Sequence, residues 1–363
     1  MKVLSLWQMY GLMLLFQLGT SVVFGIASPA KQDAWLTTFI SFFLGAGLLW
    51  LYSKLYESRQ CMNWFGLLTD AFGRWAGTVL GAVYVIIFIY SAGRNLRDAG
   101  ELTNTFLLPR TPMGATMVLF QILVCYVCYA GLRRMGRLAE LNAPIILLFF
   151  VLEVVLLLAS GAIDLTQLTP VAAEWRPIAT TVFPGSVTVP YGEAFAFAAF
   201  WSMTTSPKGF FKASLLAAAT AGFIFVVLDV VAISTLGPEL FSRSFFPLMT
   251  TFHMVNIADF IQNLDPLIVT DYMIGVLFKI SIFTFAACVV ISDMCRVDLR
   301  AAVIPVSIMI FLFAKYMADS LSSHLFTGHH WATWVIFTPF FLLVPALAFL
   351  IIKFKSVDDK EAG

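Results

Sequence analysis

The residues most able to do chemistry are charged side chains that lie inside long apolar stretches of the chain. Lys279 lies in the middle of one such stretch, and Glu153 and Asp229 lie within two others. A charged group deep in a membrane costs at least about 2.5 kcal/mol, so each of these side chains needs a partner or water. The Lys279 ammonium could take the place of a coupling cation, pair with Glu153 or Asp229, or titrate. A fixed salt bridge that locks helices together is an equally open interpretation.

Two apolar stretches are interrupted by helix-breaking residues, and polar side chains flank both interruptions. Gly19 begins the break in the first stretch, and Pro190 begins the break in the sixth. Inside a membrane, unpaired backbone groups are tolerated mainly where they line a cavity. Breaks at matching positions in the two halves of a chain indicate a substrate site. The residues that we expect to bind a ligand there are Gln17, Gly19, Thr20, Tyr191, Gly192 and Glu193.

The remaining acid and the histidines favour ordinary roles. Asp271 is expected near the outer interface, where a carboxylate reaches water readily. No cysteine or carboxylate stands at ligand spacing beside the histidines, so we expect solvated loop positions for His253, His324, His329 and His330. The sequence therefore predicts no metal site.

Familiar catalytic and cofactor patterns are missing from the sequence. Cys125 and Cys128 form a C-x-x-C pair, but they lie in an apolar helical segment, where small packing residues are the favoured interpretation. There is no phosphate-binding glycine loop followed by Lys-Ser or Lys-Thr, and no H-E-x-x-H or G-x-S-x-G motif. We therefore expect neither an enzyme nor a bound cofactor.

The elements that must position these residues follow from composition. Of the 363 residues, 60% are hydrophobic and 12% are charged, whereas a soluble domain carries roughly 25% charged residues. About 20 apolar residues cross the hydrocarbon core of a bilayer. Ten such spans are predicted, at 5–27, 34–54, 75–100, 113–131, 140–160, 178–205, 211–236, 266–292, 299–319 and 332–353. The third and eighth are expected to form the longest helices, because both continue into polar ends. The fold class is therefore an all-α integral membrane protein, with a single transmembrane domain over residues 1–363.

Lysine and arginine residues set the expected orientation. Fourteen of them fall on the side that carries both termini and seven fall on the other, while Lys279 lies inside a span. The positive-inside rule then makes both termini cytoplasmic, and the even number of spans agrees. The net charge of +1 gives no argument for nucleic-acid binding.

Five short runs carry a resemblance to a known family. In chain order they are Gln17-Leu18-Gly19-Thr20, Pro190-Tyr191-Gly192-Glu193, Phe246-Pro247, Asp265-Pro266-Leu267-Ile268-Val269 and Gly275-Val276-Leu277-Phe278-Lys279-Ile280-Ser281. By the order and spacing of these runs, the chain resembles the B subunits of bacterial spore germinant receptors, the spore-permease family, over nearly its whole length. The family often has an arginine two residues before the acidic residue of the fourth run, where this chain has Asn263.

The resemblance implies a member of the amino acid–polyamine–organocation superfamily. Such a protein has ten helices in two inverted five-helix repeats, here about 5–160 and 178–353, with broken helices 1 and 6 and a cytoplasmic tail at 354–363. The implied function is a germinant receptor subunit that binds a small nutrient, expected to be an amino acid. Its implied partners are A-type and lipoprotein C-type subunits in the inner membrane of the spore. A proton-coupled amino acid permease is the alternative function.

Overall fold

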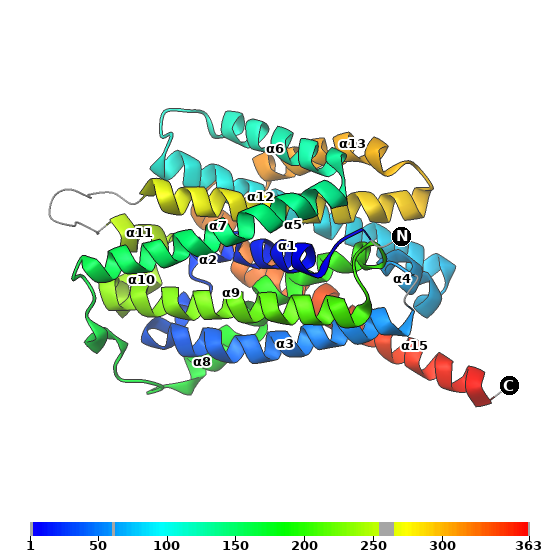
Figure 1. Cartoon of the computed structure of the whole chain (residues 1–363), viewed down its shortest axis with the longest axis horizontal. Helices are drawn as coiled ribbons and strands as arrows, with labels where there is room; N and C mark the ends of the chain where they lie inside the picture. The colour runs from blue at the N-terminus through cyan, green and yellow to red at the C-terminus, as the bar shows by residue number, and fades with distance from the viewer. Residues whose placement is uncertain (1–2, 60–61, 254–264, 362–363) are drawn as a thin grey trace.

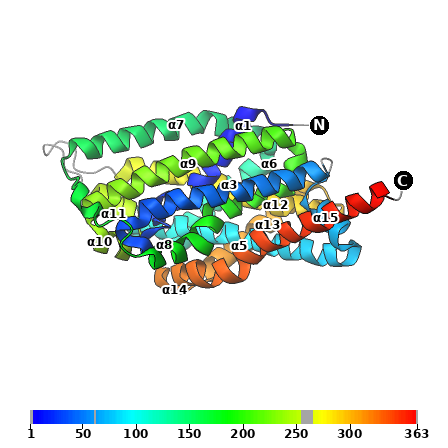
Figure 2. The same ribbon diagram turned by 90° about the horizontal axis from the view of Figure 1, so that it is seen from below.

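The long helices of this protein lie side by side along one axis. The structure is a computed structural model that describes residues 3–59, 62–253 and 265–361, and these residues contain no strand. Within that part of the chain, nine helical segments are long and apolar enough to cross a membrane. Both termini lie at the same end of the bundle, as Figure 1 and Figure 2 show. Together with the interrupted segment that precedes Pro207, these nine segments make an even number of crossings. An even number places both termini at the same end.

Most helices overlap the predicted spans, but α7 begins eight residues earlier than predicted, α5 ends six residues later, and the tenth helical segment begins at Leu321 rather than at 332. The long ones, with the short continuation of the first, are α1 (Leu6–Leu18), α2 (Ser21–Phe24), α3 (Ala34–Ser58), α5 (Arg74–Phe106), α6 (Met113–Ala130), α7 (Leu132–Ala159), α9 (Pro207–Leu236), α12 (Asp265–Cys295), α13 (Leu299–Tyr316) and α15 (Val344–Glu361). The shorter ones are α4 (Trp64–Phe72), α8 (Trp175–Thr181), α10 (Pro238–Arg243), α11 (Pro247–His253) and α14 (Leu321–Phe326). The remaining helical turns are η1 (Ser28–Asp33), η2 (Leu165–Leu168), η3 (Val182–Ser186), η4 (Thr188–Gly192), η5 (Glu193–Ala199), η6 (Trp201–Met203), η7 (Thr327–Phe337) and η8 (Pro339–Leu343). With 33 and 31 residues, α5 and α12 are the longest helices, as predicted for the third and eighth spans.

The first span breaks where the sequence predicts. Helix α1 ends at Leu18, and Gly19 takes φ 15° and ψ −125°, which lies outside the helical region. A Cβ atom at Gly19 would lie 2.6 Å from Cδ of Lys279, so the position also needs glycine for space. The chain then forms the short helix α2. This helix is capped by Gly25, whose φ of 54° is accessible to glycine without strain.

The sixth predicted span is interrupted at Phe183, Val189 and Phe200, whereas the sequence indicated one break at Pro190. Phe183 and Val189 both take extended backbone angles inside this segment. Each precedes a proline, whose ring disfavours the helical conformation of the residue before it. Between α8 and α9 the chain therefore runs through η3, η4, η5 and η6 rather than forming one long helix.

Helix α12 is the centre of the bundle. It packs against α5, α1 and α13, and its residue Lys279 has no exposed surface. The outer helices α6, α7 and α13 instead expose large apolar side chains such as Leu119, Leu148 and Ile308. This arrangement suits a bilayer, because the apolar exterior faces lipid while polar groups gather inside.

Candidate functional site

Buried polar groups from four segments meet at the break after α1. The Nζ atom of Lys279 on α12 lies 2.7 Å from Oε2 of Glu193, the first residue of η5. The same ammonium donates to Oγ1 of Thr20 at 3.4 Å. The Thr20 hydroxyl in turn donates to Oδ1 of Asn95 on α5 at 2.9 Å. The ion pair therefore ties α12 to the sixth-span segment beside the first-span break.

The partner of Lys279 is thus Glu193, and neither Glu153 nor Asp229 takes that place. Asp229 on α9 accepts a hydrogen bond from the hydroxyl of Thr38 on α3 at 2.6 Å. Glu153 on α7 is buried, and its Oε1 has no hydrogen-bond partner among the described residues. The two acids suggested by sequence lie near the break, but Lys279 points at the acid that follows the second break.

Glycines let α12 approach the break closely enough for this pairing. A Cβ atom at Gly275 would lie 3.1 Å from Cα of Gly19, which is tighter than ordinary packing. Gly275 precedes Lys279 by one helical turn, so both residues lie on the same face of α12. The Lys279 ammonium also lies 5.6 Å from the ring centroid of Phe16, which adds a cation–π contact.

A cavity of about 950 Å³, which we call the vestibule, leads to this ion pair. Thr20, Asn95 and Glu193 contribute to its lining at the break, and residues next to α8, α10 and α14 contribute elsewhere. These short helices lie at the end of the bundle opposite both termini, as Figure 2 shows for all three. The vestibule volume suits a small organic molecule, since such sites measure about 300 to 1,000 Å³.

Arg94 on α5 is the notable charged residue of the vestibule lining. Its Nε atom is buried and has no hydrogen-bond partner in the described part of the chain. The guanidinium carbon lies 5.7 Å from the ring centroid of Phe337 on η7. Arg94 and Asn95 were not expected as site residues, because the sequence placed Arg94 among the charges of the outer side. Polar residues at 94, 95 and 98 in the third span could have indicated them.

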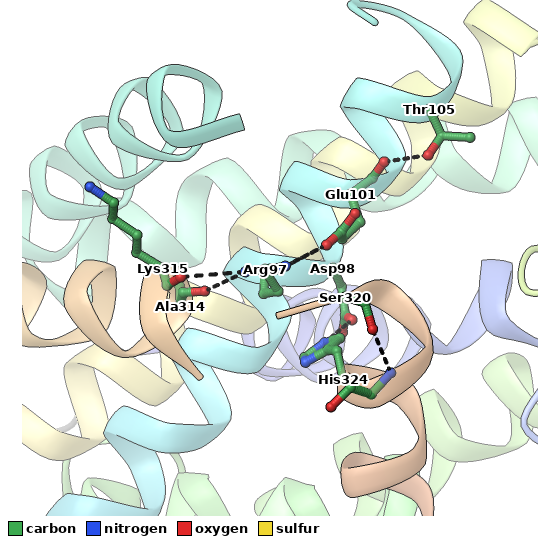
Figure 3. Close-up of polar contacts among 9 residues, drawn as sticks. Arg97, Asp98, Glu101, Thr105, Ala314, Lys315, Ser320 and His324 are labelled. Carbon is green, nitrogen blue, oxygen red and sulfur yellow. Dashed lines mark hydrogen bonds and ion pairs between the residues drawn. The ribbon is translucent and has the colours of Figure 1, made fainter. Parts of the chain in front are cut away.

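Polar contacts of Arg97 and Asp98 tie α5 to α13 and α14 (Figure 3), the first being a hydrogen bond of 3.5 Å from Nη1 of Arg97 to the carbonyl oxygen of Ala314 on α13. Arg97 pairs with Glu101 one turn further along α5, with 2.8 Å between Nη2 and Oε1. Asp98 Oδ1 lies 2.7 Å from Nε2 of His324 on α14. Because Asp98 also lines the vestibule, this contact fixes α14 beside the cavity.

His324 corrects the expectation of solvated histidines. Its exposed fraction is 3%, because α14 packs it against α5. His253 and His330 are exposed as expected, and the side chain of His329 lies outside the described residues, as does Asn263. In the described ranges, no group of three His, Cys, Asp or Glu side chains could hold a metal ion.

The six expected ligand-binding residues surround the break without sharing one cavity. Thr20 and Glu193 line the vestibule. Tyr191 lines a side pocket of about 30 Å³ together with Asp229. Gln17 and Gly192 are buried, and neither lines the vestibule or this side pocket. The amide atoms of Gln17 have no hydrogen-bond partner within the described residues.

Gly19 lines a third cavity, of about 20 Å³, with Glu153 and Asp271. We call it the acid cavity. Asp271 was expected at the outer interface, and its side chain is partly exposed in the structure, although its Oδ1 is buried. The break therefore touches two separate spaces, since Gly19 lines the acid cavity and Thr20 lines the vestibule.

Comparison with known proteins identifies the family. The spore permease model, described as "Spore germination protein", matches residues 3–322. Spore germination protein KB of Bacillus subtilis (strain 168) is 28% identical over 355 residues, which cover 97% of this chain and 95% of that protein. Spore germination protein A2 of the same organism is 21% identical over 89% of this chain and 87% of its own length. The chain belongs to the spore germination protein family.

Solved structures identify the fold. A Na⁺-coupled sialic acid symporter matches with a TM-score of 0.69 and 13% identity, covering 93% of this chain and 79% of its own. MhsT in complex with L-phenylalanine matches with a TM-score of 0.68 and 12% identity, covering 97% and 89%. Mhp1, a nucleobase-cation-symport-1 family transporter, matches with a TM-score of 0.70 and 12% identity, covering 94% and 79%. The fold is therefore leucine-transporter-like, with two inverted five-helix repeats and broken helices 1 and 6, as predicted.

Proposed function

We propose that this member of the spore germination protein family is a germinant receptor subunit that binds an amino acid in the vestibule. The observation that carries the proposal is Arg94, a vestibule guanidinium whose buried Nε has no hydrogen-bond partner in the described ranges. A buried donor without a partner is costly, and a guanidinium binds a carboxylate through two parallel hydrogen bonds. The part of the Arg94 guanidinium that reaches the vestibule would bind the nutrient carboxylate.

The floor of the vestibule supports a zwitterion. Helix α1 ends at Leu18 beside the break, so its last carbonyl groups bring the negative end of a helix dipole to the site. Thr20 and Glu193 add oxygen acceptors in the vestibule lining. An ammonium group would be stabilised by these oxygens, while Arg94 would hold the carboxylate. MhsT, which has the same fold, was solved with an amino acid, L-phenylalanine.

The cellular setting is part of the proposal. We infer that the protein works in the inner membrane of the spore with both termini cytoplasmic, and that it acts with A-type and lipoprotein C-type subunits. The support is the family, together with fourteen lysines and arginines on the terminal side against seven on the other. In this orientation the vestibule faces away from the cytoplasm and can sample external nutrients.

A proton-coupled amino acid permease is the second candidate. Two observations favour it: the fold is that of transporters, and buried carboxyl groups lie beside the first-span break. The purified protein in proteoliposomes separates the two functions. A receptor binds radiolabelled amino acids without accumulating them, whereas a permease accumulates them when a pH gradient is imposed.

Germination of spores that lack the native gene and carry variants tests the binding site. Across amino acids, sugars and nucleosides, we expect wild type to respond to an amino acid. Arg94→Gln should raise the half-maximal concentration about ten- to one-hundredfold, because a hydrogen bond to a charged group contributes about 1.5–3 kcal/mol. Arg94→Lys should raise the half-maximal concentration less, because it keeps the positive charge. Arg243→Gln is the matched control, because Arg243 lines the vestibule but is exposed and paired with Glu239. Unchanged sensitivity of Arg94→Gln at normal abundance would refute the site.

A further inference from the structure

The acid cavity has a lining unlike that of the vestibule. Five segments enclose it: α1, α2, α7, α9 and α12. Its volume of about 20 Å³ holds one water molecule. Three of its side chains are polar, namely Glu153, Asp271 and Tyr272, while the rest of the lining is Leu18, Gly19, Val22, Ile146, Phe150, Ile224 and Leu228.

The polar side chains of this cavity lack the partners that buried groups normally have. Within the described residues, no hydrogen-bond partner contacts Oε1 of Glu153, Oδ1 of Asp271 or the hydroxyl of Tyr272. Glu153 is 3% exposed and Tyr272 is 1% exposed. A buried Glu153 carboxylate that shares a cavity with the partly buried Asp271 and has no cation beside it would be strongly unfavourable, so the cavity calls for a positive charge.

No protein cation in the described ranges faces the pair. Lys279 lies on the same face of α12 as Asp271, but it is two turns further along and is paired with Glu193. From α1, α2 and α9 only apolar residues and Gly19 face the cavity, so its titratable groups are Glu153 from α7 and Asp271 and Tyr272 from α12. None of the described residues therefore supplies the positive charge, which a bound ion or proton can supply.

A proton suits this lining better than a metal ion. A hard metal cation takes about six or more oxygen ligands, whereas the side chains here offer two carboxyl groups and one hydroxyl, and the other walls are apolar apart from the main chain at Leu18 and Gly19. A proton needs one donor and one acceptor. We propose that Glu153 and Asp271 bind one proton between them. One carboxyl group carries the proton, and the other accepts a hydrogen bond from it directly or through one water.

The position of the pair links the proton to the nutrient. Gly19 lines the acid cavity and the adjacent Thr20 lines the vestibule. A nutrient that shifts the break therefore alters the space around the carboxyl pair. Thermodynamic reciprocity then requires that the bound proton alter nutrient affinity equally. This link rests on the proposed nutrient site, whereas the proton site does not.

Infrared spectroscopy of the full-length protein in lipid vesicles tests the proton site without any nutrient. At neutral pH we expect a carbonyl-stretch band of a protonated, solvent-shielded carboxyl group. The band should be absent in Glu153→Gln and shifted or absent in Asp271→Asn. It should be unchanged in Glu140→Gln, the control, which alters an exposed acid on the same helix. No band in wild type, or a band that survives both variants, overturns the proposal. Loss of the band in sodium chloride but not in choline chloride would mean that a metal ion binds instead, which also overturns it.

The link to the nutrient is measured separately, by the thermal shift that an equimolar mixture of the twenty common amino acids produces at several pH values. The shift should depend on pH in wild type and in Glu140→Gln, and should lose that dependence in Glu153→Gln. A pH-independent shift in wild type overturns the link. If the mixture gives no shift at any pH, the proposed function fails, while the infrared band still decides the proton site.

Discussion

Removing the charge of Lys279 should destabilise the protein far more than removing an exposed charge. Lys279 has no exposed surface, the Glu193 side chain is 4% exposed, and 2.7 Å separates the charged atoms. Lys279→Met keeps the length and apolar stem of the side chain but leaves the Glu193 carboxylate without its cation. Breaking one partner of a buried pair costs about 3–5 kcal/mol. Glu193→Gln should cost a similar amount, because it leaves the ammonium unpaired.

The double variant separates the penalty of an unpaired charge from the value of the pair itself. Replacing both partners leaves no buried charge, so Lys279→Met combined with Glu193→Gln should recover most of the loss of either single change. Lys54→Met is the control. It breaks a pair with Glu57 whose side chains are 41% and 31% exposed, and it should cost less than about 1 kcal/mol.

Unfolding of purified protein in lipid nanodiscs measures these costs, and spore germination measures signalling. If Lys279 has a coupling role, the double variant should be stable yet fail to respond to nutrient. If its role is structural, the double variant should be stable and responsive. The reasoning is refuted if either single variant is as stable as wild type, or if the double variant is no more stable than the worse single one.

Three further outcomes are expected from the packing and the orientation of the helices. Gly19→Ala should cost about 1–3 kcal/mol in unfolding free energy, because its Cβ would lie 2.6 Å from a side chain of α12, whereas Gly47→Ala, with nothing within 4 Å, should be neutral or slightly stabilising; equal effects would contradict the close packing. His324→Gln should loosen α14 by about 1–3 kcal/mol by removing its hydrogen bond with Asp98 of α5, seen as faster hydrogen exchange in α14 and nowhere near the termini. In protoplasts of a strain without other accessible cysteines, a cysteine at Arg134 should be shielded from an impermeant thiol reagent and one at Arg243 should react; the reverse pattern would invert the orientation.

The membrane spans were predictable because they depend on length and composition alone. About twenty apolar residues suffice to specify a crossing, and the observed helices overlap the predicted ranges, although bounds such as those of α5 and α7 differ by six to eight residues. The break at Gly19 was predictable for a similar local reason. The interruption at Phe183 was not predicted, although Phe183 precedes a proline and such a residue disfavours the helical conformation.

Side-chain partners were not predictable from the sequence, because they depend on how helices rotate and on their relative depth. Glu153, Asp229 and Glu193 all lie within predicted spans, so the sequence alone does not show which of them pairs with Lys279. Only the tertiary packing of α12 against the break selects Glu193. His324 shows the same limit, since nothing local indicates that α14 folds back to place this histidine against Asp98.

Two different cations serve the carboxyl groups around the first-span break. The Lys279 ammonium is permanent, whereas the proton proposed for the acid cavity exchanges with its surroundings. The Lys279 ammonium is part of the chain and already neutralises Glu193, so the floor of the vestibule carries no net charge from this pair. A protein with a fixed ammonium beside the broken helix has no need of a bound sodium ion at that place, which implies that the nutrient response does not depend on sodium. The acid cavity on α7 and α12 has no such built-in cation. If the proposed proton site is correct, coupling between an ion and the nutrient acts through Glu153 and Asp271, and its natural variable is pH rather than salt.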